Sequence, residues 1–259
     1  SVDEDSKAMN GLAKCLDYIT QFQIAFNSLS KIFSSSDIQR ELVTQTKDLT
    51  TIEHQYKIWG LHARDSPRVY KLCANQKAVQ MFEGFIEKTD EIQSKLEAFL
   101  QKKRTAFPRF YFLSNENLLK IFAEARNPKA VQPFLPKLFE GIQTLQFSQN
   151  GQDILSMTSP EGEVIPLGKT QTLGAIEGWM SNMEKSMKTA LHRVLKNGRS
   201  TYIDSERKSW LQQNPAQVVS VITQINFSMQ VENALSSVNP KDALMELRDK
   251  QEAQLRDLA

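Results

Sequence analysis

The chain has few of the residues that mark disulfide frameworks, disordered linkers or metal sites. Among 259 residues it has two cysteines, three histidines, ten glycines and nine prolines. Cys15 and Cys73 both lie in helical apolar patterns and are predicted to be buried thiols. The low glycine and proline content excludes a fibrous or largely disordered chain. His54, His62 and His192 lack partners at zinc-ligand spacing, so no metal site is predicted.

A strong net charge and a long apolar run are also missing. The 32 basic and 30 acidic residues give a formal charge of +2 without a basic patch, so neither nucleic acid nor a membrane is an expected partner. No apolar run approaches the roughly 20 residues of a membrane helix. The polar, acidic start from Ser1 to Asp5 argues against a secretory signal. We therefore expect a soluble, intracellular protein.

Hydrophobic periodicity predicts helices through the first hundred residues. They are expected over 12–33, from Ser36 or Asp37 through 42, over 50–62, from Ser66-Pro67 to 75, and over 75–104. The last would form a rod about 45 Å long. Its basic end, Lys102-Lys103-Arg104, is interpreted as a solvated terminus that complements the helix dipole.

An aromatic segment follows the long helix: Phe107, Pro108, Arg109, Phe110, Tyr111, Phe112 and Leu113. It is predicted to be extended, because a proline disfavours helix at the preceding residue. Alternate residues of a strand share a face. This places Phe110 and Phe112 on one side with Pro108, and Phe107, Arg109 and Tyr111 on the other. Both faces are aromatic, so Phe107, Phe110 and Phe112 are predicted to be buried anchors.

The remaining sequence predicts one small sheet between helical regions. Pro128, Pro133 and Pro136 are expected to divide the chain into short helical turns. Strands are predicted at 142–147, 153–158 and 163–167, with turns at 150–151 and 159–162. Helices are expected over 173–194, closed by Asn197-Gly198, then around Trp210 and after 215 and 240.

The predicted fold is therefore mainly α, an elongated multi-helix arch with one antiparallel β-meander at about 142–167. We expect four regions along it. Residues 1–104 form an N-terminal helical block ending in a long helix, and 105–141 an aromatic extended segment with short proline-broken helices. The meander occupies 142–167, and 168–259 form a C-terminal helical block.

Gly168-Lys169-Thr170 resembles the end of a phosphate-binding loop between a strand and a helix. The Walker pattern needs a glycine at position 163, where this chain has glutamate. A carboxylate there would repel a phosphate, and Pro166 removes an amide from the loop. A small P-loop enzyme is therefore a disfavoured alternative. No serine or cysteine has a local nucleophile signature, so no catalytic, cofactor-binding or metal residue is assigned.

The aromatic segment also carries a family resemblance. Lys102-Lys103-Arg104 followed by 107–115 resembles the dynein heavy-chain linker. Residues 118–121, 131–133, 137–142 and 159–163, the Trp179 helix, and Trp210 followed by 215–219 resemble the same family in the same order. The likeness extends from about Ile32 to Leu258. The signature positions are Phe107, Pro108, Arg109, Phe110, Tyr111, Phe112, Trp179, Trp210 and Pro215.

The resemblance implies a mechanical function. In this family the linker is a mostly helical arch over a ring of AAA+ modules, and it bends and straightens with the ATP cycle. The implied partner is the AAA+ ring of the same heavy chain, with ATP and Mg bound only in AAA+ modules outside this chain. Microtubules would be reached only through other missing parts.

The resemblance also indicates a class and leaves one alternative. The helix after Pro215 and the charged helix from Asp242 to Asp257 are more similar to axonemal than to cytoplasmic heavy chains, which implies a cilium or flagellum. Bending is predicted between about Arg104 and Ser114. The alternative there is a rigid packed corner, with the hinge nearer the N-terminus. An independent helical scaffold or adaptor is the alternative function.

Overall fold

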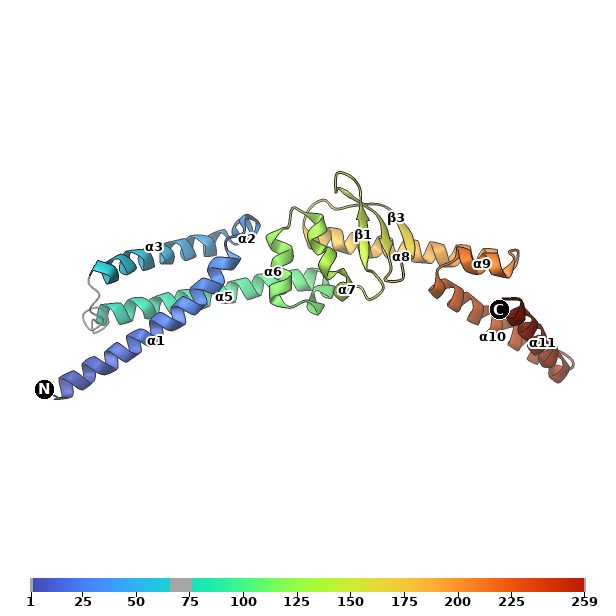
Figure 1. Cartoon of the computed structure of the whole chain (residues 1–259), viewed down its shortest axis with the longest axis horizontal. Helices are drawn as coiled ribbons and strands as arrows, with labels where there is room; N and C mark the ends of the chain where they lie inside the picture. The colour runs from blue at the N-terminus through green and yellow to red at the C-terminus, as the bar shows by residue number, and fades with distance from the viewer. Residues whose placement is uncertain (1, 66–75, 259) are drawn as a thin grey trace.

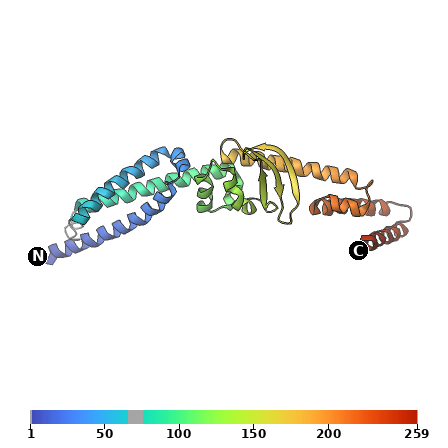
Figure 2. The same ribbon diagram turned by 45° about the horizontal axis from the view of Figure 1, so that its top comes forward.

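The computed structural model describes residues 2–65 and 76–258, so the short helix predicted between Ser66 and Asn75 lies outside the described residues. The molecule is elongated, with an N-terminal arm, a central part containing the sheet, and a C-terminal group of helices following one another along its long axis (Figures 1 and 2). It is mainly helical with one small antiparallel sheet, which confirms the predicted fold class.

Within the described residues, the N-terminal arm contains the helices α1 (Val2–Ile32), α2 (Ser36–Glu41), α3 (Val43–Asp65) and α5 (Gln76–Ala106). Three of them lie along one another (Figure 1). Apolar residues at helical spacing fill their shared core, in which the ring centroid of Phe22 lies 5.1 Å from that of Phe85. α3 begins earlier than predicted. α5 matches the predicted rod, and its 31 residues span about 46 Å.

Short helices connect the arm to the sheet. They are η1 (Pro108–Phe112), α6 (Asn115–Ala123), η2 (Pro128–Phe134) and α7 (Leu135–Leu138). Side-chain oxygens cap the N-termini of two of them. The Ser114 hydroxyl accepts a bond from the Asn117 amide at 3.3 Å, and the Asn127 side chain accepts one from the Lys129 amide at 3.1 Å. η2 and α7 are the short helical turns that the three prolines predicted, whereas η1 forms where an extended segment was expected.

The sheet is a meander of β1 (Thr144–Phe147), β2 (Asp153–Thr158) and β3 (Val164–Gln171), in the order β1-β2-β3. Thr144 pairs with Thr158, and Thr158 pairs with Val164. The meander confirms the prediction, although β3 continues four residues further than expected. α8 (Ile176–Thr201) packs against β3.

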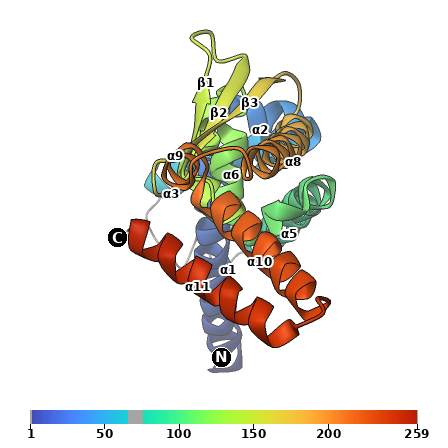
Figure 3. The same cartoon turned by 90° about the vertical axis from the view of Figure 1, so that its right-hand side faces the viewer.

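The C-terminal group contains α9 (Arg207–Gln213), α10 (Ala216–Leu235) and α11 (Pro240–Leu258). α10 and α11 pack side by side (Figure 3). α8 continues through Asn197 and Gly198 to Thr201, so the predicted helix end there is wrong. Among the described residues, no helix has the length and apolar character needed to cross a membrane.

The buried apolar side chains of the described residues form three cores along the molecule. The N-terminal core extends from Cys15 to Leu96, and the central core from Leu100 to Ala190. The C-terminal core contains three buried residues among those described, Trp210, Val218 and Ile222. The proline-broken stretch, the sheet and most of α8 therefore share one core. α5 contributes Leu96 to the first core and Leu100 to the second.

Candidate functional site

The signature segment at the end of α5 forms a 3-10 helix, so the predicted extended strand is wrong. Phe107 has extended backbone angles, φ −134° and ψ 95°, as expected before a proline. Pro108 then starts the helix, because its fixed φ suits the first helical position. The amide of Phe110 donates to the Phe107 carbonyl at 3.0 Å, and that of Leu113 donates to the Phe110 carbonyl at 3.1 Å. The restriction by proline affects only the preceding residue.

The 3-10 helix buries one side of the segment. Its repeat of three residues puts Phe107, Phe110 and Leu113 on one face, and all three are buried. Tyr111 is exposed and Phe112 is 67% exposed, so the predicted burial of both faces and of Phe112 is wrong. The burial predicted for Phe107 and Phe110 is confirmed.

Aromatic contacts explain why this face anchors the segment. The ring of Phe110 lies 4.9 Å from that of Phe107 and 5.9 Å from that of Phe122 on α6, both in edge-to-face geometry. Phe107 also lies 6.4 Å from Phe139, just after α7. The segment therefore joins the end of α5 to α6 and α7 through one continuous aromatic cluster.

Arg109 ties the same segment to two further elements. Its Nη1 donates a hydrogen bond to the Leu138 carbonyl at 2.9 Å, and its guanidinium lies 4.5 Å from the centre of the Phe139 ring. Nη2 lies 3.5 Å from Glu184 on α8. A hydrogen bond from Lys188 holds the pKa of Glu184 below its ordinary value, and the charge of Arg109 acts in the same direction against the effect of burial.

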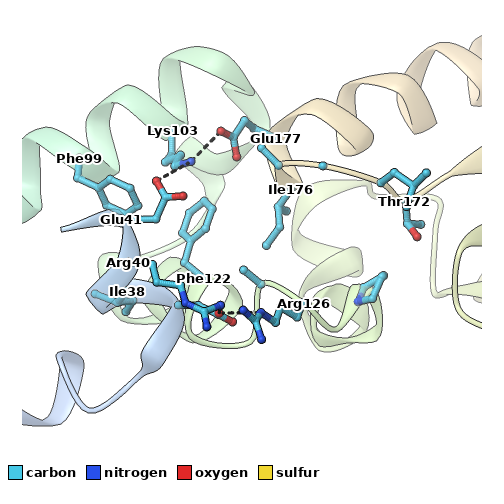
Figure 4. Close-up of a pocket in the computed structure, with 16 residues that line it drawn as sticks. Ile38, Arg40, Glu41, Phe99, Lys103, Phe122, Arg126, Thr172, Ile176 and Glu177 are labelled. Carbon is cyan, nitrogen blue, oxygen red and sulfur yellow. Dashed lines mark hydrogen bonds and ion pairs between the residues drawn. The ribbon is translucent and has the colours of Figure 1, made fainter. Parts of the chain in front are cut away.

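The basic end of α5 is packed into this junction, so its interpretation as a solvated terminus is wrong for two of its three residues. Nζ of Lys103 lies 2.8 Å from Glu177 on α8 and 3.8 Å from Glu41 on α2 (Figure 4). The Lys103 and Glu177 side chains are only 13% and 17% exposed. Arg104 donates to the Leu113 carbonyl at 2.9 Å. Through these contacts the end of α5 is connected to α2, to α8 and to the backbone after η1.

A cavity of about 460 Å³ lies beside Lys103, between the arm and the central part. Its charged lining is balanced, with three acidic and three basic side chains: Asp37, Glu41 and Glu177, and Arg40, Lys103 and Arg126. Asp37 on α2 lies 3.4 Å from Arg126, which follows α6. In residues 2–65 and 76–258 no group of three potential ligands could hold a metal ion. The opposite charges around this cavity come from different elements, so their ion pairs hold those elements together.

The Gly168-Lys169-Thr170 triplet lies inside β3, so its predicted position between a strand and a helix is wrong. Thr170 pairs with Ile154, and Gln171 with Asp153, in the antiparallel ladder. Gly168 has φ of +79° at an irregularity in the register. Thr170 is therefore paired in the sheet, and Gly168 and Lys169 lie at the irregularity between the paired residues Pro166 and Thr170.

Of the last three signature residues, Trp179 lies on α8, Trp210 on α9, and Pro215 directly before α10. Trp179 is buried in the central core on α8. Trp210 is buried beside Tyr202, and its Nε1 donates to the Gly198 carbonyl at 2.9 Å. Pro215 precedes α10, whose first amide, at Ala216, donates to Glu163 Oε1 at 2.8 Å.

The sequence did not predict several residues that connect these elements: Lys103 as a partly buried cation, Glu41, Glu177, Glu163 and Gly198. Lys103 and Glu177 are 74 residues apart, and Glu163 and Ala216 are 53 apart. Helical periodicity says nothing about such distant pairs. The one local signal was Lys103 itself, which lies one helical turn after Phe99 on the apolar side of α5 and places its Nζ 5.3 Å from that ring.

Comparisons with a family model and with individual curated proteins find the same family. The family model described as "Dynein heavy chain, N-terminal region 2" matches residues 1–198. The mouse protein "Dynein axonemal heavy chain 3" is 33% identical over 247 residues, which cover 94% of this chain and 6% of that protein. The human "Dynein axonemal heavy chain 6" is 34% identical over 244 residues, covering 86% of this chain and 6% of its own. This chain therefore spans a small fraction of the length of these relatives.

Proposed function

The chain belongs to the dynein heavy-chain family, and we propose that it is a segment of the linker, the mechanical lever of that motor. One observation carries this proposal. α5 is a single helix of 31 residues whose side chains enter both the N-terminal and the central core. A helix shared by two cores transmits a displacement of one to the other, because it can tilt only if both repack.

The contacts around α5 support a stiff connection. Lys103 and Arg104 bind to groups on α2, α8 and the backbone after η1. Arg109 binds to the end of α7 and to α8. α8, with 26 residues, then extends away from the junction for about 39 Å. A displacement of the arm would therefore reach α8 through packed side chains and bonded charges.

In this proposal the segment itself is not catalytic. ATP and Mg²⁺ bind to AAA+ modules outside this chain, and the AAA+ ring of the same heavy chain is its partner. The motor meets the microtubule through other parts of the heavy chain. The relatives are named axonemal heavy chains, which supports a location in the axoneme of a cilium or flagellum.

The lever proposal is tested by uncoupling. Phe110→Ala in the full heavy chain removes the central ring of the junction, so we expect slower microtubule gliding while ATP turnover by the ring persists. Phe112→Ala, an exposed neighbour on the same turn, is the matched control and should glide normally. A Phe110 variant that moves microtubules as far per ATP as the parent would contradict the lever.

The proposal that this segment is not catalytic is tested separately. Calorimetric titration of the isolated chain with ATP should show no micromolar binding. Binding that disappears in Lys169→Ala would contradict it, because that lysine belongs to the triplet that resembles a phosphate-binding loop.

The position of bending is a separate question. The sequence predicts it between Arg104 and Ser114, yet α5 is continuous to Ala106 and the contacts after it favour the alternative of a packed corner. Two nucleotide states of the full motor, superposed on residues 115–258, would decide between them. If residues 76–104 also superpose, the corner is rigid; if they swing away, the junction is the hinge.

A further inference from the structure

Arg207 begins α9, and its guanidinium lies against two aromatic rings at the corner between α8 and α9. The guanidinium carbon is 4.9 Å from the centre of the Tyr202 ring, which directly follows α8, and 5.0 Å from that of Trp210 on α9. The two rings meet edge to face, with their centroids 5.1 Å apart. Because the faces of aromatic rings attract a cation, they hold the guanidinium at this corner.

From this position the Arg207 side chain reaches α10. Its Nη2 donates a hydrogen bond to the Thr223 hydroxyl at 2.8 Å. The start of α10 is held separately, by the bond from the Ala216 amide to Glu163. Thr223 is seven residues after Ala216, which is about 10 Å along the helix. A single contact lets a helix pivot, whereas two contacts at this separation fix the direction of its axis.

The apolar packing between these two bonds does not fix that direction by itself. Gly198 on α8 is closely approached by Val218 and Ile222 on α10. Hydrophobic contact is non-directional, and a glycine has no side chain that could interlock with its neighbours, so α10 can tilt about this point. A hydrogen bond weakens steeply as its angle departs from linear. The bond from Arg207 to Thr223 therefore opposes the tilt that the packing permits.

The buried guanidinium is not explained by stability. Nη1 of Arg207 is buried and has no hydrogen-bond partner within the described parts of the chain. A buried donor without an acceptor destabilises the folded state, and an apolar side chain of similar size avoids that cost. An arginine at this position is explained by the directional bond that its Nη2 makes.

We propose that Arg207 is a positioning residue that fixes the direction of α10, and of α11 packed against it, relative to α8. Its bond to Thr223 acts as a clamp. With the bond made, the C-terminal helices take one direction, and without it they take a range of directions about Gly198. The clamp itself goes beyond the lever proposal and does not depend on it. In a linker it also sets the direction in which the segment continues past α8, and that consequence alone rests on the proposed function.

The distance between two spin labels tests the clamp. The labels are placed at Asn182 on α8 and Lys250 on α11, both exposed, as genetically encoded amino acids that leave the native cysteines in place. In the parent chain we expect one narrow distribution of distances. Arg207→Met keeps contact with the two rings but removes the donors. We therefore expect its distribution to be about twofold broader or more, with the midpoint of thermal unfolding unchanged or higher.

Thr223 offers a matched pair of variants. Thr223→Ser keeps the hydroxyl and should give the distribution of the parent. Thr223→Val keeps the shape but removes the acceptor, so it should broaden the distribution as Arg207→Met does. Thr189→Val is the control, because the Thr189 hydroxyl bonds to the Lys185 carbonyl within α8, and it should leave the distribution unchanged.

Three results would overturn the proposal. A narrow distribution in folded Arg207→Met or in Thr223→Val would show that packing alone fixes the direction. Broadening in Thr223→Ser as large as that in Thr223→Val would assign the direction to the methyl group of Thr223. A broad distribution in the parent would show that the bond does not fix it. If Arg207→Met does not fold, the two Thr223 variants decide. None of these results involves microtubule gliding, so a failure here is distinguishable from failure of the lever.

Discussion

The two joints of this molecule differ in how they are made. At the joint between the N-terminal arm and the central part, α5 is continuous, and its end is held by buried phenylalanines and by three basic side chains with named partners. At the joint between the central part and the C-terminal helices, the core among the described residues contains Trp210, Val218 and Ile222. Polar contacts, including those from Trp210 to Gly198 and from Ala216 to Glu163, support it.

The difference indicates that the stiffness of each joint depends on the size of the core that it contains. Regions with few buried apolar contacts open at lower free energy than regions with many. The first joint can move only if a large core repacks, whereas the second depends on a small core and one close helix approach. We therefore expect the second joint to open first, and each variant below is chosen to change one joint while leaving the other as a reference.

The largest effect is expected at the first joint. Phe110→Ala removes a buried ring from the central core and should lower the free energy of unfolding of that core by about 3–5 kcal/mol. Phe112→Ala should change it little, because Phe112 is mostly exposed. Chemical denaturation with region-resolved hydrogen exchange measures both. Equal effects of the two variants would refute the one-sided burial of the 3-10 helix.

The next effect is expected at the second joint. A Cβ at Gly198 would lie 2.8 Å from the Asn214 side chain, 2.9 Å from Val218 and 3.0 Å from Ile222. Gly178 lies on the same helix with open space around it, so Gly178→Ala should stabilise α8 by about 0.5–1 kcal/mol. Gly198→Ala adds overpacking, and we expect the two variants to differ by about 1–3 kcal/mol.

Hydrogen exchange locates that effect. Faster exchange in Gly198→Ala should be confined to α9, α10 and α11, with α1 and α5 unchanged. Faster exchange spread evenly over the whole chain would show that the two joints unfold together, and the contrast between them would not hold.

A smaller effect is expected where Glu163 accepts a hydrogen bond from the first amide of α10. Glu163→Ala leaves that amide without its partner and should destabilise the start of α10 by about 1 kcal/mol, as the loss of a helix cap does. Glu161→Ala removes an exposed carboxylate from the same turn and is the control. Amide exchange at residues 216–219 is the measurement. Unchanged exchange in Glu163→Ala would mean that this contact contributes nothing to the joint.

The smallest effect is a dependence on pH at the first joint. The pKa of Glu184 is lowered from 4.5 in the folded chain, first by the hydrogen bond from Lys188. A lowered pKa in the folded state means that the stabilisation is complete above the unfolded pKa and is lost as pH falls through the folded value. Glu184→Gln should therefore lose less stability than the parent when pH falls below about 4.5.

Glu116 provides the matched control for this measurement. It pairs with Lys120 at the same four-residue spacing, and its pKa is also lowered, first by the hydrogen bond from Lys120, but both side chains are exposed. Solvent screens such a pair, so Glu116→Gln should follow the acid dependence of the parent. If both variants behave alike, Arg109 adds nothing to the Glu184 pair.

Most of the helices and the meander could be predicted from the sequence, because their signals are local. Apolar residues at three- and four-residue steps specified α1 and α5, and the turn residues around Gly151 and Gly162 specified the hairpins. The candidate site was predicted only in part. Phe107 and Phe110 are buried as expected, but the segment that contains them is helical, and the partners of Lys103 were not foreseen.

The sequence by itself determined the helical periodicity, the position of the sheet and the family, because each is written in neighbouring residues or in an ordered series of motifs. Only the tertiary structure decided which face of Pro108–Phe112 is buried, that Lys103 meets Glu177, and that α8 continues through Gly198. Asn197-Gly198 would serve as a helix end in isolation. Here the missing side chain of Gly198 instead lets α10 approach α8, and the energy of that approach depends on residues that are distant along the chain.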